Sequence, residues 1–153
     1  MKDIDPKEPN LAQALSDLSA WSQKFPRSSF ANDRAYFYIH VYNRMNRPDQ
    51  VLDAAAPVVN AGVRTNYNDP QQVLQILVAA SSGLSRLRTP TAEQRSTGTR
   101  AARELRAFLP EYFAQDRKPD GVSSSAWTGA RQQLEDVARE ALARYPARVA
   151  SSH

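Results

Sequence analysis

Side chains that could carry acid–base chemistry are few in this sequence. His40 is the only histidine before the final residue His153, and Asp33 precedes it by about two helical turns. The two could form a proton relay, but a catalytic relay also needs a nucleophile placed by the fold, and no turn motif of that kind is present. Glu135 and Asp136 are adjacent on an expected helix, so their side chains diverge. We therefore predict no catalytic residues and no enzymatic activity.

Metal and cofactor chemistry lacks its usual side chains. The chain has no cysteine, which excludes disulfides, thiolate metal sites and cysteine nucleophiles. A single internal histidine cannot build a protein-only zinc site without relying on carboxylates. We expect neither a metal ion nor a cofactor.

Arginines provide most of the positive charge and are the next candidates for binding. The formal net charge is +4, from 20 Lys and Arg against 16 Asp and Glu. Six arginines fall in one stretch: Arg86, Arg88, Arg95, Arg100, Arg103 and Arg106. On a helix, Arg95, Arg103 and Arg106 lie within about 80° of one another, as a basic face that could bind phosphates or an acidic surface. No glycine-rich phosphate loop accompanies them, so we favour a solvated outer face whose arginine stems cover the core edge.

Composition is ordinary for a soluble globular chain, with 41% hydrophobic and 24% charged residues. No apolar run approaches the roughly 20 residues that a transmembrane helix needs. The amino terminus, MKDIDPKEPN, is charged and contains prolines, unlike a signal peptide, although a signal removed earlier would leave no trace. The sequence leaves open whether the compartment is cytoplasmic or periplasmic, and it leaves the oligomeric state open.

Apolar residues recur every three or four positions along most of the chain, which is typical of amphipathic helices. Six helices are expected, over about residues 10–25, 30–45, 49–62, 69–87, 89–108 and 125–145. Pro57 predicts a kink or break in the third helix, and Pro110 predicts the end of the fifth. Asp69, with Gln72 three residues later, predicts a capping box. No strand pattern is present, so the expected fold class is all-α.

One part of the chain resembles a known repeat. The stretch 31–59 resembles a tetratricopeptide repeat, a pair of antiparallel helices with medium and small residues at set positions. The residues at these positions are Ala35, Tyr38, Ile39, Tyr42, Asn46, Val51, Ala55 and Val58, of which Val51 stands where the family has its first small alanine. Lys24-Phe25-Pro26 and Arg144-Tyr145-Pro146 resemble the signature that ends a repeat, and residues 24–59 are also similar to repeat-bearing lipoproteins of bacterial envelope assembly. Asn46 stands where the family has its turn glycine, and residues 66–120 match only in helical period.

The resemblance implies a single domain over residues 1–153, with flexible ends at 1–8 and 147–153. About six helices would form antiparallel hairpins in a right-handed superhelical array that buries one face of each helix and exposes a curved surface. A non-repeat helical bundle is the alternative. The sequence also leaves open whether this chain is the amino-terminal piece of a longer repeat protein.

The resemblance also implies where a partner would bind, because the first helix of each repeat in the family lines a concave groove. By position, the groove residues here are Asp33, Tyr36, His40, Asn43 and Arg44. An aromatic ring, two charges and two hydrogen-bonding groups suit peptide recognition. We therefore expect a protein–protein interaction module that binds a peptide or protein segment. One alternative is binding of nucleic acid or anionic lipid at the arginine face, although nucleic acid is not the expected partner. Another is an architectural role as a spacer or dimer surface.

Overall fold

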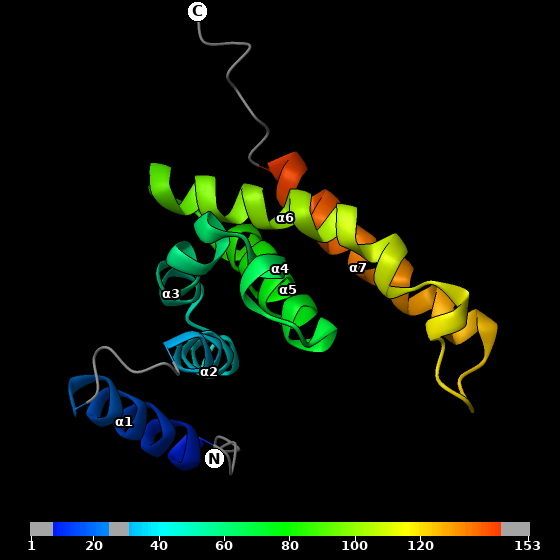
Figure 1. The fold of residues 1–153 in the computed structure, drawn as a ribbon. Helices are drawn as coiled ribbons and strands as arrows, with labels where there is room; N and C mark the ends of the chain where they lie inside the picture. Colours follow the sequence, from blue (N-terminus) through cyan, green and yellow to red (C-terminus); the bar gives the residue numbers. More distant parts are fainter. Residues whose placement is uncertain (1–7, 25–30, 145–153) are drawn as a thin grey trace, which may run out of the picture.

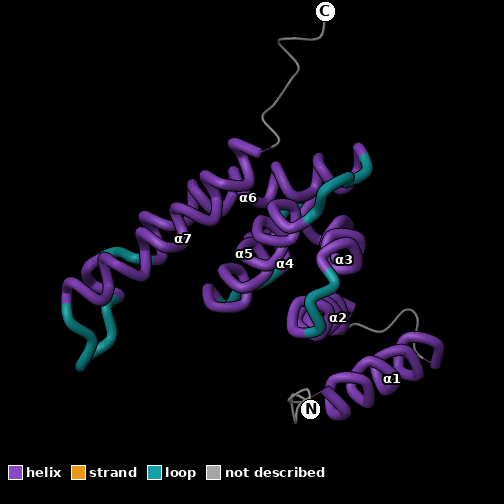
Figure 2. Tube along the Cα trace, turned by 180° about the vertical axis from the view of Figure 1, so that it is seen from behind, coloured by secondary structure: helices purple, strands orange, loops and turns teal. Residues whose placement is uncertain are grey.

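The computed structural model describes residues 8–24 and 31–144. Within these ranges all regular structure is helical, as the tube in Figure 2 shows, which confirms the all-α prediction. The elements are α1 (Glu8–Lys24), α2 (Ala31–Arg44), α3 (Pro48–Ala61), α4 (Val63–Asn66), α5 (Pro70–Arg86), α6 (Ala92–Tyr112), the 3-10 turn η1 (Gln115–Arg117) and α7 (Ser124–Arg144). The segment 147–153, expected to be flexible, lies outside the described residues. In the other expected end, 1–8, only Glu8 is described, and it begins α1.

The number of helices differs from the sequence prediction, and two prolines lie inside helices that continue past them. The described ranges hold seven α-helices instead of six, because the short α4 lies between the third and fourth predicted helices. Pro57 does not interrupt α3, and α6 continues through Pro110 to Tyr112. Both prolines are exposed, as are Asp53 and Arg106 one turn earlier. Water can therefore satisfy the carbonyl groups that lose an N–H partner, and the helices continue.

Helix ends are fixed by local hydrogen bonds at specific residues. The Asp69 side chain accepts a hydrogen bond from the Gln71 N–H at the start of α5. The full capping box belongs to α6 instead, where Thr91 and Gln94 bond reciprocally. The prediction of a capping box at Asp69 and Gln72 therefore placed the motif on the wrong helix.

The turn between α2 and α3 depends on Asn46. This residue adopts φ 56°, a left-handed conformation that asparagine tolerates better than most residues. The Asn46 N–H bonds to the carbonyl of Asn43 at 3.1 Å, and the Arg47 N–H bonds to that of Tyr42 at 3.0 Å. These two bonds form a Schellman motif, which ends α2 and reverses the chain.

The helices stack in a regular order from α1 at one end to α7 at the other (Figure 1). The pairs α2–α3, α5–α6 and α6–α7 pack as sequential neighbours. In addition α2 contacts α5, α5 contacts α7, and α3 contacts both α5 and α6. Each long helix after α1 therefore packs against its neighbours in sequence and also against a more distant helix, whereas α1 packs mainly on α2.

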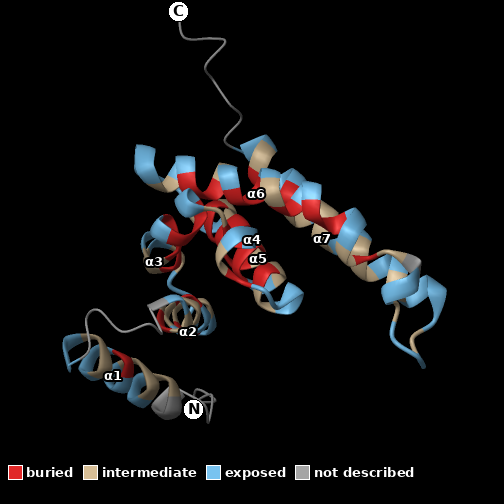
Figure 3. Ribbon diagram, in the orientation of Figure 1, coloured by how far each residue is buried: buried red, intermediate tan, exposed pale blue. Residues whose placement is uncertain are grey.

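The core lies along α3, α5 and α6, where buried residues are concentrated (Figure 3). Leu52, Ile76, Leu77, Leu84 and Leu105 are among its fully buried side chains. In α1 Leu18 is the one buried hydrophobic residue among those described. Burial therefore decreases from the centre of the stack toward α1.

Across the described ranges, no helix combines the length and apolarity needed to cross a bilayer.

Candidate functional site

A cavity of about 320 Å³ opens where three helices face one another. Tyr36, Ile39, His40 and Asn43 of α2 line one side of it. The opposite side is formed by Leu74, Gln75, Ile76, Val78 and Ala79 of α5, with Leu134 of α7. Aliphatic residues form most of the lining and polar groups come mainly from α2. We call this cavity the α2–α5–α7 groove.

The α2 side of the groove is an aromatic edge held by hydrogen bonds. The rings of Tyr36 and His40 stack with centroids 6.2 Å apart. The Tyr36 hydroxyl donates to Oε1 of Gln75, which joins α2 to α5 across the groove. The Gln75 side chain makes no other hydrogen bond within the described ranges, so the N–H groups of its side-chain amide are available to a ligand.

Asn43 is oriented by an arginine from the end of α5. Arg86 donates from Nη2 to Asn43 Oδ1 at 3.0 Å and from Nη1 to Asn46 Oδ1 at 2.5 Å. Because the Asn43 oxygen is engaged, its Nδ2 remains as a donor at the groove. Arg86 therefore also ties the α2–α3 turn to α5. This contact removes Arg86 from the free arginine cluster that the sequence suggested.

Two titratable groups at the groove are shifted by their surroundings. Partial burial, and then the Arg44 charge, lower the pKa of His40 below its usual value. Partial burial, and then the Asp69 carboxylate, raise the pKa of Tyr36. At neutral pH both side chains are therefore uncharged, and the groove presents hydrogen-bonding groups beside an aliphatic surface.

Of the five predicted groove residues, the structure brings three to the cavity. Tyr36, His40 and Asn43 line it, whereas Asp33 and Arg44 do not. Asp33 lies near the start of α2, one turn before Tyr36, and Arg44 lies about 100° around the α2 axis from Asn43. Asp33 instead acts on Tyr67, whose pKa it helps to raise.

Sequence reasoning missed the α5 wall and Leu134 of α7. Leu74 and Val78 are four residues apart on one face of α5 and are only partly buried. An aliphatic pair at that spacing in a helix predicts core packing as readily as a binding surface. The spacing of Leu74 and Val78 is visible in the sequence, but it does not show which neighbouring helix, if any, covers the two side chains.

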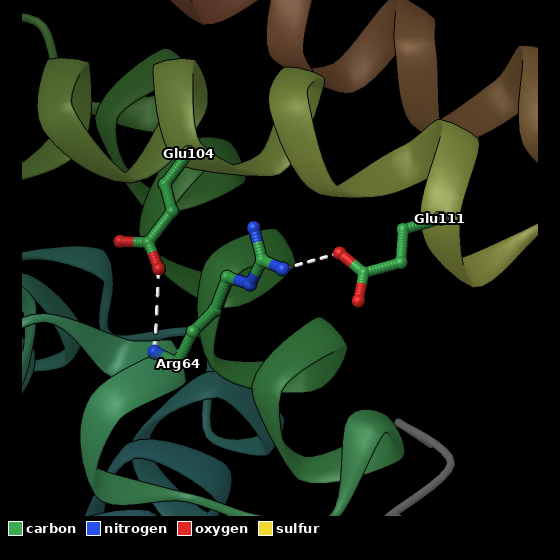
Figure 4. Close-up of polar contacts among 3 residues, drawn as sticks. All are labelled: Arg64, Glu104 and Glu111. Carbon is green, nitrogen blue, oxygen red and sulfur yellow. Dashed lines mark hydrogen bonds and ion pairs between the residues drawn. The ribbon is translucent and has the colours of Figure 1, made fainter.

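The short helix α4 is braced against α6 by charged contacts (Figure 4). The Arg64 guanidinium pairs with Glu111 and lies over the Phe108 ring, 5.1 Å from its centroid. Glu104 accepts a hydrogen bond from the Arg64 N–H at 3.3 Å. Arg64 and Glu111 border a shallow polar hollow of about 250 Å³. Because the charges of Arg64 and Glu111 neutralise each other, we assign these contacts a structural role, which is to hold the α3–α5 connection against α6.

The arginine face of α6 is present as a surface. The side chains of Arg95, Arg103 and Arg106 are exposed and make no hydrogen bond or ion pair with another residue of the described ranges. Arg100 donates to Asn60 Oδ1 at 3.4 Å and so contacts α3. The exposed basic face therefore contains fewer arginines than the cluster in the sequence.

Two of the three acidic residues of α7 pair with arginines on the same helix. Glu135 pairs with Arg131 at 3.6 Å, and Asp136 pairs with Arg139. Over the part of the chain that the structure describes, no group of three or more His, Asp or Glu side chains is placed to hold a metal ion.

No protein-family model, no curated protein and no solved structure matches this chain. The α2–α5–α7 groove and the other surfaces described above are therefore the basis for assigning a function.

Proposed function

We propose that the protein is an interaction module of the tetratricopeptide-repeat type that binds a peptide segment in the α2–α5–α7 groove. The order of helix contacts supports a repeat array: α2 with α3 and α5 with α6 form successive hairpins, and α7 continues the row of α2 and α5. α1 would be the second helix of a preceding repeat, and Asn46 would fill the role of the turn glycine.

The observation that carries the proposal is the composition of the groove. Its volume of about 320 Å³ lies near the lower end of the range for ligand pockets, roughly 300–1,000 Å³. Three helices that are separate in sequence contribute to it, and the α5 wall is aliphatic. Such a cavity fits one or two apolar side chains of a larger partner better than a complete small molecule.

The polar groups at the groove suggest how a peptide backbone would bind. Asn43 Nδ2 and the Gln75 amide N–H groups are donors, and the oxygens of both side chains are already engaged. Peptide carbonyl groups are the complementary acceptors. We therefore expect an extended or irregular segment whose apolar side chain enters the cavity while its carbonyls accept from Asn43 and Gln75.

The test is selection of binding peptides from a random display library with the wild-type chain. Selected peptides should share an apolar anchor, and their affinity should fall about tenfold or more for Tyr36→Ala, because buried aromatic anchors dominate such interfaces. Gln75→Ala should weaken binding less. Circular dichroism and thermal unfolding would establish that the variants are folded.

Arg103→Ala/Arg106→Ala provides the matched control, because it changes a surface on α6 that is separate from the groove. Peptides that bind this control and wild type equally, but not Tyr36→Ala, support the groove. Peptides that lose affinity only for the arginine variant, with steep salt dependence, would transfer the binding function to the arginine face. An absence of selected peptides would contradict the proposal.

A further inference from the structure

A second apolar hollow, of about 300 Å³, lies between α1 and α2. Ala14, Leu18 and Trp21 of α1 and Phe37 and Val41 of α2 line it, together with Asp17. We call this surface the α1–α2 face. Phe37 is 45% exposed, and every other large hydrophobic side chain of the described ranges is buried or half-buried. An exposed phenylalanine at the edge of an apolar hollow indicates an interaction surface.

The packing of the other helices shows what occupies equivalent positions in this chain. α2 lies against both α3 and α5, which also contact each other. α5 lies in the same way against α6 and α7. α1 and α2 form the corresponding pair at the first end of the stack, and no described helix fills the groove between them (Figure 1). The groove therefore has the form of a helix-binding site.

The opposite end of the stack is closed by polar side chains. On α7 the residues that point away from the stack are Gln132, Gln133, Asp136, Arg139 and Glu140, all exposed. Asp136 pairs with Arg139 and accepts a hydrogen bond from Gln132. Pressing the apolar centre of the α1–α2 face onto this surface would remove the Asp136–Arg139 pair and Glu140 from water. Head-to-tail stacking of copies is thus disfavoured.

We propose that the α1–α2 face binds the same face of a second copy of this chain about a two-fold axis. A two-fold interface needs a self-complementary patch. Phe37, Val41 and Arg44 follow one another at i, i+4 and i+7 on α2, and Asp17 lies on α1. The face therefore carries both charge signs beside its apolar centre, so Asp17 of one copy can meet Arg44 of the other while Phe37 and Trp21 lose contact with water.

The proposal is tested by mass against concentration, using light scattering or sedimentation from low micromolar to millimolar protein. The wild-type mass should rise from the monomer value of 17.1 kDa toward twice that value and then stop. Phe37→Glu should raise the dimer dissociation constant at least about tenfold. Gln133→Glu, which adds the same charge to the polar face of α7, should dimerise like wild type.

A cross-linking measurement keeps the test independent of how Phe37→Glu folds. Because the chain has no cysteine, Ala14→Cys and Gln133→Cys each carry a single thiol. A bismaleimide should link Ala14→Cys into dimers and leave Gln133→Cys unlinked. A wild-type mass that stays at 17.1 kDa, growth beyond a dimer, or equal linking of both thiols would overturn the proposal. In the first case the α1–α2 face would be left for a helix of another protein.

Discussion

The pKa of His40 is sensitive to the polarity of the groove around it. Its ring stacks on Tyr36, and burial followed by the Arg44 charge lowers its pKa. We therefore predict an NMR titration midpoint below the ordinary value of about 6.5. Arg44→Ala should raise the midpoint only in part, because burial is the larger cause. A midpoint at or above 6.5 would contradict the packing of His40 against Tyr36.

The same shift predicts a pH dependence of stability. Between the lowered folded-state pKa and about 6.5, the unfolded chain binds more protons than the folded chain, so stability rises with pH in that window and falls as the solution is acidified. Urea unfolding of wild type and His40→Asn across this window should show a steeper dependence for wild type. Equal slopes would mean that His40 titrates alike in both states.

Tyr67 gives the opposite dependence at alkaline pH. Burial, and then Asp33, raise its pKa from 10.0 to about 12, and its hydroxyl donates to the Asn32 carbonyl at 2.5 Å. The unfolded chain loses this proton first, so the contribution of Tyr67 is complete below pH 10 and is lost as pH rises toward 12.

Tyr67→Phe should therefore cost about 1 kcal/mol near neutral pH, from the lost hydrogen bond. At about pH 11 the difference in unfolding free energy between variant and wild type should shrink by about 1 kcal/mol. The reason is that only wild type has the Tyr67 proton, which its unfolded chain has largely lost at that pH. Urea unfolding at the two pH values measures both quantities. A difference that stays constant would place the Tyr67 hydroxyl in water.

At the scale of elements, substitutions at Gly98 of α6 and Gly129 of α7 are expected to have opposite effects on stability. A Cβ on Gly98 would lie 2.6 Å from Leu84 Cβ and 2.8 Å from Leu84 Cδ2, and Leu84 is fully buried. Gly98→Ala should therefore destabilise by about 1–3 kcal/mol, although alanine is the better helix former. A Cβ on Gly129 meets nothing within 4 Å. Gly129→Ala should stabilise by about 0.5–1 kcal/mol.

Denaturant unfolding of the two alanine variants measures this contrast. Gly129→Ala is the matched control, since it makes the same chemical change on an open helix surface. Stabilisation by both substitutions would show that α5 and α6 are further apart at Gly98 than described.

The element scale also shows what the sequence could and could not predict. Periodicity located the long helices, because each has one apolar face. The helix break considered at Pro57 and the helix end expected at Pro110 are absent, because local rules do not show whether water reaches the carbonyl one turn earlier. Periodicity also missed α4, which has only four residues and is positioned by contacts from Arg64 to α6. Such a segment depends on tertiary contacts, which leave no period in the sequence.

The candidate site was predictable to the extent that it lies on one helix. The spacing of Tyr36, His40 and Asn43 places them together once α2 is a helix. Their partners Gln75 and Arg86 are 39 and 43 residues away from Tyr36 and Asn43. Those pairings depend on how hairpins stack, which a degenerate repeat pattern does not determine.

At the scale of the whole molecule, the stack predicts a gradient of local stability. α5 contacts α2, α3, α6 and α7, whereas α1 packs mainly on α2. Leu18 is the one buried hydrophobic side chain among the described residues of α1, and α5 carries Ile76, Leu77 and Leu84 at 0% exposure. In a linear stack, each helix is stabilised mostly by its neighbours.

Amide hydrogen exchange of dilute wild-type protein should therefore show α1 opening at much lower free energy than α5 and α6, whose slowest amides approach the global unfolding free energy. Dilution matters, because a second copy on the α1–α2 face would protect α1. The expected result is a rate for α1 that slows as protein concentration rises, while α5 and α6 do not change. If α1 instead exchanges as slowly as α5 in dilute protein, then contacts outside the described residues stabilise it, and the end of the stack is not the weak point that the packing predicts.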